Sequence, residues 1–206
     1  MKDLIKRYPV LEVCKGEVAA ACDELENCFK RGGKLLLCGN GGSAADCDHI
    51  VGELTKGFIS KRPLSAAKKA KMKEQFPTIS DSTLKLLQDA LPAISLPSVT
   101  SLCSAFSNDV EPELIYAQGV LALSKPNDVL IAISTSGNSR NVLRAAEVAR
   151  ALGVTVIALT GNGGGLLREV SDICICVPEC ETYKVQELHL PVYHYLCAAV
   201  EEHFFG

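Results

Sequence analysis

The sequence predicts an α/β protein built on a doubly wound parallel sheet. Short apolar runs alternate with segments of helical periodicity, and glycine-rich turns separate the two kinds of segment. Strands that are joined through helices run parallel to one another. Because the apolar runs have no polar face, the sheet is expected to be covered by helices on both sides. The length of 206 residues suits a single domain over 1–206.

The first unit is a helix, a strand and a second helix. Apolar residues recur every three or four positions between 9 and 31, which predicts an amphipathic helix that Gly32 and Gly33 end. The run KLLLC at 34–38 predicts a buried strand, GNGGS at 39–43 a turn, and the next helix begins near Ser43.

The same unit recurs along the chain. Further strands are predicted at 91–96, 128–134, 154–160 and 172–178. Helices follow the last three, the last of them long and starting near residue 181. Residues 64–90 interrupt this order and are predicted to form a helical insertion. Because 61–75 hold six of the 21 basic residues and one acid, a solvated basic helix, an acidic partner and a lid over a phosphate all remain open.

Composition excludes several classes of protein. A net charge of −3 gives no footprint for nucleic acid, and no apolar run approaches the ~18 residues that span a membrane. The N-terminus lacks the apolar core of a secretory signal, so a cytoplasmic location is expected. Most of the ten cysteines fall at apolar positions and are interpreted as reduced, buried hydrophobes.

Two turns between a strand and a helix have the composition of phosphate-binding loops. CGNGGSAAD at 38–46 supplies glycines and a helix N-terminus, with Ser43 and Asp46 spaced as a capping box. ISTSGNS at 133–139 adds hydroxyl groups at a second helix N-terminus. GNGGG at 161–165 offers a third loop of this kind. Ligands of such sheets bind at the carboxyl ends of the strands, although a purely structural turn remains the alternative.

Polar residues on two helices form further candidates. His49 and Glu53 stand at i and i+4, on one face of the second helix. Gln186, His189 and His194 share the last helix, where Pro191 removes one backbone hydrogen bond. Such residues either pair at a surface or interface, or line a site.

Together, CGNGGSAADCDHIVGEL, ISTSGNSRNVL, VTVIALTGNGGG and VQELH…YH resemble the sugar isomerase (SIS) family, and within it the phosphoheptose isomerase branch. The resemblance implies a five-stranded parallel sheet between helices and a homotetramer whose active sites use more than one subunit. The implied reaction interconverts sedoheptulose 7-phosphate and D-glycero-D-manno-heptose 7-phosphate for heptose biosynthesis. The implied partner is therefore a phosphorylated sugar, with no nucleic acid and no membrane.

The resemblance also assigns roles to residues. Glu53 and His194 match the acid/base pair of an isomerisation through an enediolate. The positions that match substrate-binding residues are Asn40, Gly41, Ser43, Asp109, Ser134, Thr135, Ser136, Ser139 and Gln186. The positions that match a zinc site are His49, Glu53, Gln186 and His194. A Zn²⁺ ion would polarise the carbonyl, but Glu53 cannot bind it tightly and act as a free base at once.

Three features depart from the family pattern: Gly57 stands where an arginine is frequent, Pro191 stands where an aliphatic residue is usual, and the 64–90 insertion is extra. A different six- or seven-carbon sugar phosphate therefore remains an alternative substrate. Two other classes are also open. One is a non-catalytic SIS module that binds a phosphosugar or a replication-initiator protein, and the other is a phosphosugar-sensing module. Glu53 and His194 favour the enzyme, since the initiator-binding relative lacks both.

Overall fold

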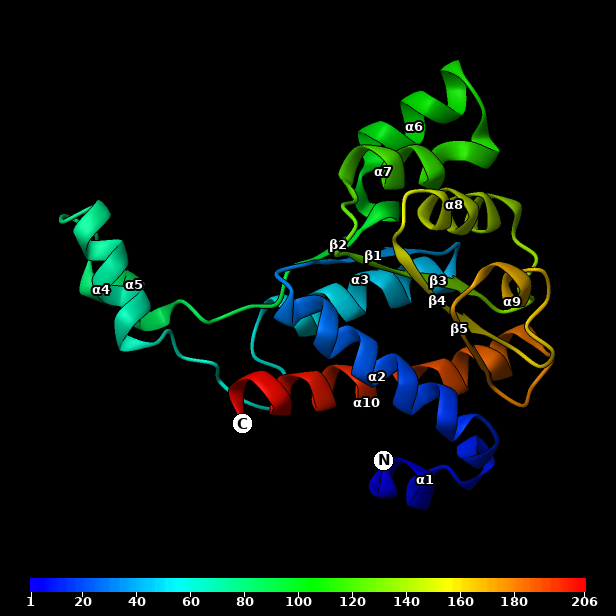
Figure 1. Cartoon of the computed structure of the whole chain (residues 1–206), viewed down its shortest axis with the longest axis horizontal. Helices are drawn as coiled ribbons and strands as arrows, with labels where there is room; N and C mark the ends of the chain where they lie inside the picture. The colour runs from blue at the N-terminus through cyan, green and yellow to red at the C-terminus, as the bar shows by residue number, and fades with distance from the viewer.

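A five-stranded parallel sheet lies at the centre of the computed structural model, which describes all residues 1–206 (Figure 1). Its strands lie in the order β2-β1-β3-β4-β5, and all four pairings are parallel. Their bounds are β1 Leu35–Cys38, β2 Ala93–Ser95, β3 Val129–Ser134, β4 Thr155–Thr160 and β5 Ile173–Cys176. The doubly wound α/β class and all five predicted strands are confirmed, with slightly shorter ends.

Helices cover both faces of the sheet, and the side chains of each strand alternate between them. In β1, Leu35 and Leu37 belong to one apolar core, and Leu36 and Cys38 belong to the other. The first core is covered by α2 (Lys15–Lys30), α3 (Gly42–Thr55) and α10 (Thr182–Phe205). The second is covered by α7 (Ile115–Leu123), α8 (Arg140–Ala151) and α9 (Leu167–Val170). This two-sided burial explains why the strands are apolar throughout.

The N-terminal segment differs in detail from its prediction. The helix expected over 9–31 is a 3₁₀ helix over Pro9–Cys14 followed by α2, and Gly32 ends it with a φ of +73°. A short helix, α1 (Lys2–Arg7), precedes it. The sequence predicts no element between 97 and 127. This segment contains α6 (Thr100–Asp109), α7 and two 3₁₀ turns, Leu96–Ser98 and Pro112–Leu114.

The insertion projects from the body as a hairpin of two helices (Figure 1). Its helices are α4 (Ala66–Gln75) and α5 (Asp81–Leu86). Ser65 accepts a hydrogen bond from the Lys68 N–H (3.2 Å), and Ser80 accepts one from the Thr83 N–H (3.0 Å), so both helices have side-chain caps. No residue of α4 is buried. The predicted helical insertion is therefore confirmed. It forms an arm in which α4 is stabilised by hydrogen bonds within the arm and not by burial against the body.

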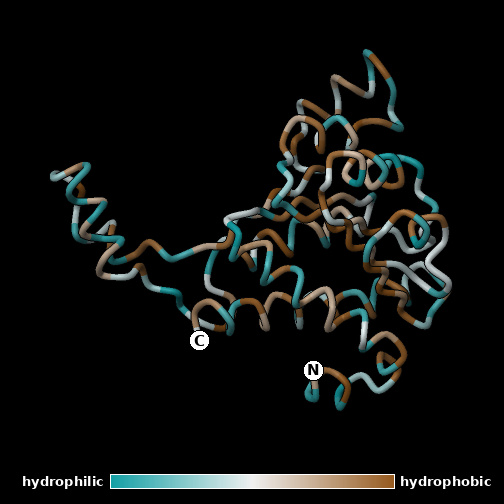
Figure 2. The backbone as a smooth tube through the Cα atoms, in the orientation of Figure 1, coloured by the Kyte–Doolittle hydropathy of each residue, from teal (hydrophilic) through white to brown (hydrophobic).

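Two smaller predictions concern the cysteines and the membrane. All ten cysteines are free thiols, and six are buried, in agreement with their interpretation as small hydrophobes. None of the helices is both long and apolar enough to cross a bilayer. The backbone tube coloured by hydropathy shows mixed colours along α10, whose 24 residues include polar positions at intervals (Figure 2).

Candidate active site

The two glycine- and serine-rich loops meet at the carboxyl ends of β1 and β3 and border one cavity of about 280 Å³. Because β1 and β3 are adjacent in the sheet, the helices that follow them, α3 and α8, begin beside each other. The lining carries hydroxyl, amide and backbone groups and no charged side chain. It consists of Asn40, Gly41, Gly42, Ser43, Ile133, Ser134, Thr135, Ser139, Thr182 and Gln186. Seven residues expected to bind substrate thus surround a single cavity.

Hydrogen bonds between side chains hold the two loops together. The amide of Asn40 donates to the Asn141 side chain (2.8 Å), and the Asn141 amide donates back (2.9 Å). The Tyr116 hydroxyl donates to the Gly39 carbonyl (2.8 Å), and Ser134 and Ser139 share a hydrogen bond (2.9 Å). Asn141 and Tyr116 were missed, because their partners lie about 75 to 100 positions away in the sequence.

Glycines are required at two positions of these loops. Gly41 has a φ of +54° and turns the chain into α3. A Cβ on Gly137 would lie 1.9 Å from the Gly164 carbonyl oxygen. The GNGGG turn at 161–165 therefore packs against the second loop and braces it. None of the residues of this turn lines the cavity, so the structure does not bring the third loop to it.

The remaining loop expectations also need correction. Ser43 does not cap α3: the N-cap is Gly41, which has no side-chain cap, and Asp46 pairs with Tyr193 instead. Ser136 does not line the cavity, and its hydroxyl accepts a hydrogen bond from the Asn138 N–H (3.2 Å) within its own turn. Asp109 ends α6, where its carboxylate accepts a hydrogen bond from the neighbouring Asn108 (2.7 Å). The structure therefore does not bring Ser136 and Asp109 to the cavity.

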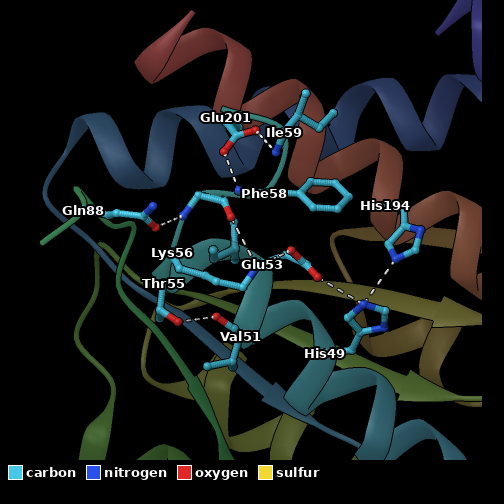
Figure 3. A network of polar contacts seen from close by, with 12 residues as sticks. His49, Val51, Glu53, Thr55, Lys56, Phe58, Ile59, Gln88, His194 and Glu201 are labelled. Atoms are coloured by element: carbon cyan, nitrogen blue, oxygen red, sulfur yellow. Dashed lines mark hydrogen bonds and ion pairs between the residues drawn. The ribbon is translucent and has the colours of Figure 1, made fainter. Parts of the chain in front are cut away.

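A second polar cluster lies between α3 and α10 (Figure 3). His49 Nε2 lies 3.3 Å from a Glu53 oxygen and 3.4 Å from His194 Nε2. The Lys56 ammonium donates to the other Glu53 oxygen (3.1 Å), and the Phe58 ring lies 5.5 Å from the His194 ring. The structure thus brings together His49, Glu53 and His194 from two helices, as the resemblance implied.

Tyr193 orients this cluster from behind. Its hydroxyl donates to an Asp46 oxygen (3.2 Å) and lies 3.0 Å from His49 Nδ1. The hydroxyl proton is used toward Asp46, so the tyrosine oxygen is free to accept from His49 Nδ1, while His49 Nε2 faces both the Glu53 carboxylate and His194 Nε2. Burial, followed by the charge on His49, lowers the pKa of His194, which favours its neutral form.

Two residues of α10 stand apart from the cluster. His189 is fully buried with neither ring nitrogen hydrogen-bonded, and burial lowers its pKa to about 4. It is thus a neutral core residue. Gln186 lies at the loop cavity, where its amide nitrogen would sit 2.4 Å from a Cβ on Gly42. The four expected zinc ligands are therefore divided between the cavity and the cluster.

Helix α3 connects the cavity to the cluster. Ten residues separate Ser43 from Glu53, which corresponds to about 15 Å at the helical rise of about 1.5 Å per residue. Gly42, His49 and Glu53 fall on one side of this helix, because their spacings are close to whole numbers of turns. The cavity and the carboxylate therefore lie along the same side of one helix.

Comparisons with known proteins agree with this geometry. SIS domain profiles match residues 6–94 and 101–199. The phosphoheptose isomerase of Rhodospirillum rubrum is 40% identical over 189 residues, covering 92% of this chain and 87% of that protein. This chain belongs to the phosphoheptose isomerase family. A phosphoheptose isomerase of Campylobacter jejuni is 38% identical over 193 residues, covering 94% of this chain and 90% of the relative.

Solved structures of phosphoheptose isomerases have the same fold. GmhA from Neisseria gonorrhoeae superposes with a TM-score of 0.76 at 30% identity, over 98% of this chain and 94% of that one. The Francisella tularensis enzyme gives 0.75 at 29% identity, with the same coverages. The protein is therefore a phosphosugar isomerase, and the non-catalytic classes considered above are set aside.

Proposed function

We propose that the protein interconverts sedoheptulose 7-phosphate and D-glycero-D-manno-heptose 7-phosphate. The observation that carries this proposal is the arrangement of one cavity lined by uncharged groups and one carboxylate–imidazole cluster along a single helix, α3. The distance along that helix, about 15 Å from Ser43 to Glu53, suits a seven-carbon chain with a terminal phosphate. The names of the relatives support the same substrate.

The cavity would hold the phosphate with neutral donors. The N-termini of α3 and α8 both open on it, and each presents free backbone N–H groups and a partial positive charge. Ser43, Ser134, Thr135 and Ser139 add hydroxyl groups. Because no lysine or arginine lines the cavity, the phosphate would bind through hydrogen bonds that orient it rather than through a point charge.

The cluster would carry out the proton transfers. The Glu53 carboxylate removes a proton from C1 of the ketose, and the same proton or one from solvent is delivered to C2 of the enediolate. His194, whose lowered pKa favours the neutral form, would donate to the oxygen that becomes negative and take part in moving the hydroxyl proton between O1 and O2. The side chain of Glu53 is 14% exposed, so the carboxylate is shielded but accessible to a ligand.

We also propose that His49, Glu53 and His194 bind Zn²⁺ when no substrate is present. A bound ion would polarise a carbonyl, but it would occupy the carboxylate and imidazole groups that the proton transfers use, so it would have to release Glu53 and His194 before they act as base and acid. The separations of His49 Nε2 from the Glu53 oxygen and from His194 Nε2, 3.3 and 3.4 Å, match the edge of about 3.4 Å in a tetrahedron with ligands at about 2.0–2.1 Å. No three His, Cys, Asp or Glu side chains converge on one point in the structure, so the cluster must close by a small side-chain movement. Gln186 lies at the cavity and would have to turn to supply a fourth ligand.

Zinc binding is tested without any substrate. Isothermal titration of the metal-stripped protein with Zn²⁺ should give one site per chain, and His49→Ala should abolish it. An unchanged affinity in His49→Ala would refute the site. Gln186→Ala, measured beside it, reports whether this residue supplies the fourth ligand.

A homotetramer is proposed on the family assignment. Large apolar side chains on the surface, among them Val13, Ile59 and Leu86 at 70–80% exposure, are consistent with surfaces that are covered in an assembly. Light scattering after gel filtration should give four times the chain mass of 22.0 kDa. A mass of one chain would contradict this proposal.

The substrate is tested by conversion and deuterium exchange. Sedoheptulose 7-phosphate incubated with the protein in D₂O should gain deuterium at C1 or C2 and yield the aldose, as followed by NMR. Fructose 6-phosphate serves as the six-carbon comparison and should react at least tenfold more slowly. Equal or faster conversion of the six-carbon sugar would overturn the substrate assignment, while no exchange with either sugar would overturn the proposed reaction.

A further inference from the structure

An ion pair between Arg62 and Glu201 lies behind the cluster, where α3, α10 and the segment 56–62 that follows α3 meet. Arg62 Nε donates to a Glu201 oxygen at 2.6 Å, and the two side chains are only 0% and 3% exposed. The Arg62 guanidinium also stacks 4.9 Å from the centre of the Phe205 ring. Every hydrogen bond of this pair leads to an element that carries part of the cluster.

Arg62 holds the end of α3. Its two remaining nitrogens donate to the carbonyl of Leu54 (2.7 Å) and to the carbonyl of Glu53 itself (3.0 Å). These carbonyls belong to the last turn of the helix, which has no partners within the helix for them. The guanidinium therefore fixes the backbone of the residue proposed as the base.

Glu201 holds the segment that follows α3. Its carboxylate accepts hydrogen bonds from the backbone N–H groups of Phe58 (2.8 Å), Ile59 (2.7 Å) and Ser60 (3.0 Å), as Figure 3 shows for the first two. Burial raises the pKa of this carboxyl, but the N–H groups and Arg62 outweigh it and hold the pKa below its ordinary value. Phe58 is thereby placed against the His194 ring, and His194 lies two turns before Glu201 on α10.

Burying this ion pair has a desolvation cost that a purely structural link between the two elements would not need. Two charges are removed from water, and a well-packed apolar pair of similar volume would stabilise a fold at least as well. Arg62 is also the only residue other than glycine with a positive φ, at +43°. Strained backbone of this kind persists where the surroundings require a particular geometry.

We infer that Arg62 and Glu201 are positioning residues that set the Glu53 carboxylate and the His194 ring at their working distance. The inference rests on the proposed roles of Glu53 and His194. Neither Arg62 nor Glu201 is accessible to a ligand, so both act through the groups that they hold. Loss of the pair should reduce the rate of proton transfer and leave phosphate binding at the distant cavity unchanged.

The test compares Glu201→Gln with a matched control, Asp128→Asn. The Asp128 carboxylate is equally buried (3% exposed), pairs with the Lys34 ammonium and accepts the N–H groups of Lys34 (2.9 Å) and Lys125 (2.7 Å), but it lies before β3, away from the cluster. Both variants should unfold more easily in urea. Only Glu201→Gln should lower kcat, by about tenfold or more, with KM within twofold of the wild type.

Arg62→Met and Arg62→Lys complete the series. Methionine should lower kcat at least as much as Glu201→Gln does, and lysine, which can reach one of the three acceptors, should recover part of the loss. All variants are assayed at a temperature where circular dichroism shows them folded. An equal fall of kcat in Glu201→Gln and Asp128→Asn, or a change confined to KM, would overturn the inference.

Glu53→Gln separates this inference from the proposed function. Full turnover in Glu53→Gln would mean that the proposed base is wrong, and the inference would fall with it. An inactive Glu53→Gln beside a fully active Glu201→Gln would leave the proposed function standing and refute the positioning role alone.

Discussion

The loop cavity and the helix cluster are two halves of one site that are built in different ways. The cavity is formed mainly by two continuous motifs, 39–43 and 134–139, that follow adjacent strands, with Thr182 and Gln186 of α10 completing its lining. The cluster consists of single side chains on α3 and α10, held in place by residues far away in the sequence. Binding can thus rest on local backbone geometry, while proton transfer depends on long-range contacts. Substitutions in the two regions should consequently have different kinetic signatures.

The largest effect is expected at His194. Replacing it by Asn removes the proton donor for the oxygens, and general acid catalysis contributes typically about 10²–10⁴-fold to a rate. We expect kcat to fall about 10²–10³-fold with KM changed less than threefold. Steady-state kinetics on sedoheptulose 7-phosphate measures both values. A rise in KM with kcat unchanged would place His194 in binding rather than in chemistry.

Low pH should reduce the free energy of unfolding through His189. This residue lies on α10 between Gln186 at the cavity and His194 in the cluster. Its pKa is about 4 when folded and about 6.5 in the unfolded chain. The unfolded state therefore binds a proton first as the pH falls. The free energy of unfolding should therefore be unaffected by this group above about pH 6.5, and it should fall by about 3 kcal/mol as the pH is lowered from about 6.5 to about 4.

Urea unfolding at pH 7.5, 5.5 and 4.5 measures this slope. His189→Leu, an apolar residue of similar size, should flatten it while both regions stay intact. An equally steep slope in the leucine variant would show that another group is responsible.

A smaller effect is expected at the cavity. The double substitution Ser134→Ala and Ser139→Ala removes two hydroxyl groups that would bind the phosphate, and a hydrogen bond to a charged group contributes about 1.5–3 kcal/mol. We expect KM to rise about 10- to 100-fold and kcat to change less than threefold. Inhibition by inorganic phosphate should weaken in parallel. A selective loss of kcat would mean that the two regions do not divide binding and chemistry.

The smallest effect is expected on the arm. Ser65→Ala removes the cap of α4, which costs about 1 kcal/mol locally. Because α4 has no buried residue, the free energy of global unfolding and kcat should stay within measurement error of the wild type. Amide hydrogen exchange should become faster in 66–75 alone. A change in kcat would show that the arm, which begins just after Arg62, affects the cluster.

Sequence reasoning was most successful where the signal is local. The five strands are short apolar runs, and glycine-rich turns mark the two loops and the start of α3. The prediction was weakest over 97–127, where α6 and α7 are only ten and nine residues long and 3₁₀ turns lie beside them. The capping role of Ser43 failed because Gly41, with its positive φ, already begins the helix.

The site shows the same division. Asn40, Gly41, Ser43, Ser134, Thr135 and Ser139 were placed correctly around the cavity because they belong to contiguous motifs. The partners Tyr193 with Asp46, and Arg62 with Glu201, are about 140 positions apart and have no local signature. Gln186 was expected with the histidines, but its position on α10 brings it to Gly42 at the cavity instead.

Deuterium exchange in Glu53→Gln tests most directly whether binding and proton transfer are divided in this way. Sedoheptulose 7-phosphate would be titrated into the variant in D₂O, with phosphorus NMR to follow binding and proton NMR to follow exchange at C1 and C2. We predict a phosphate signal that shifts with an affinity close to that of the wild type, together with exchange at least about 10³-fold slower. Exchange at the wild-type rate in Glu53→Gln would contradict the assignment of the base.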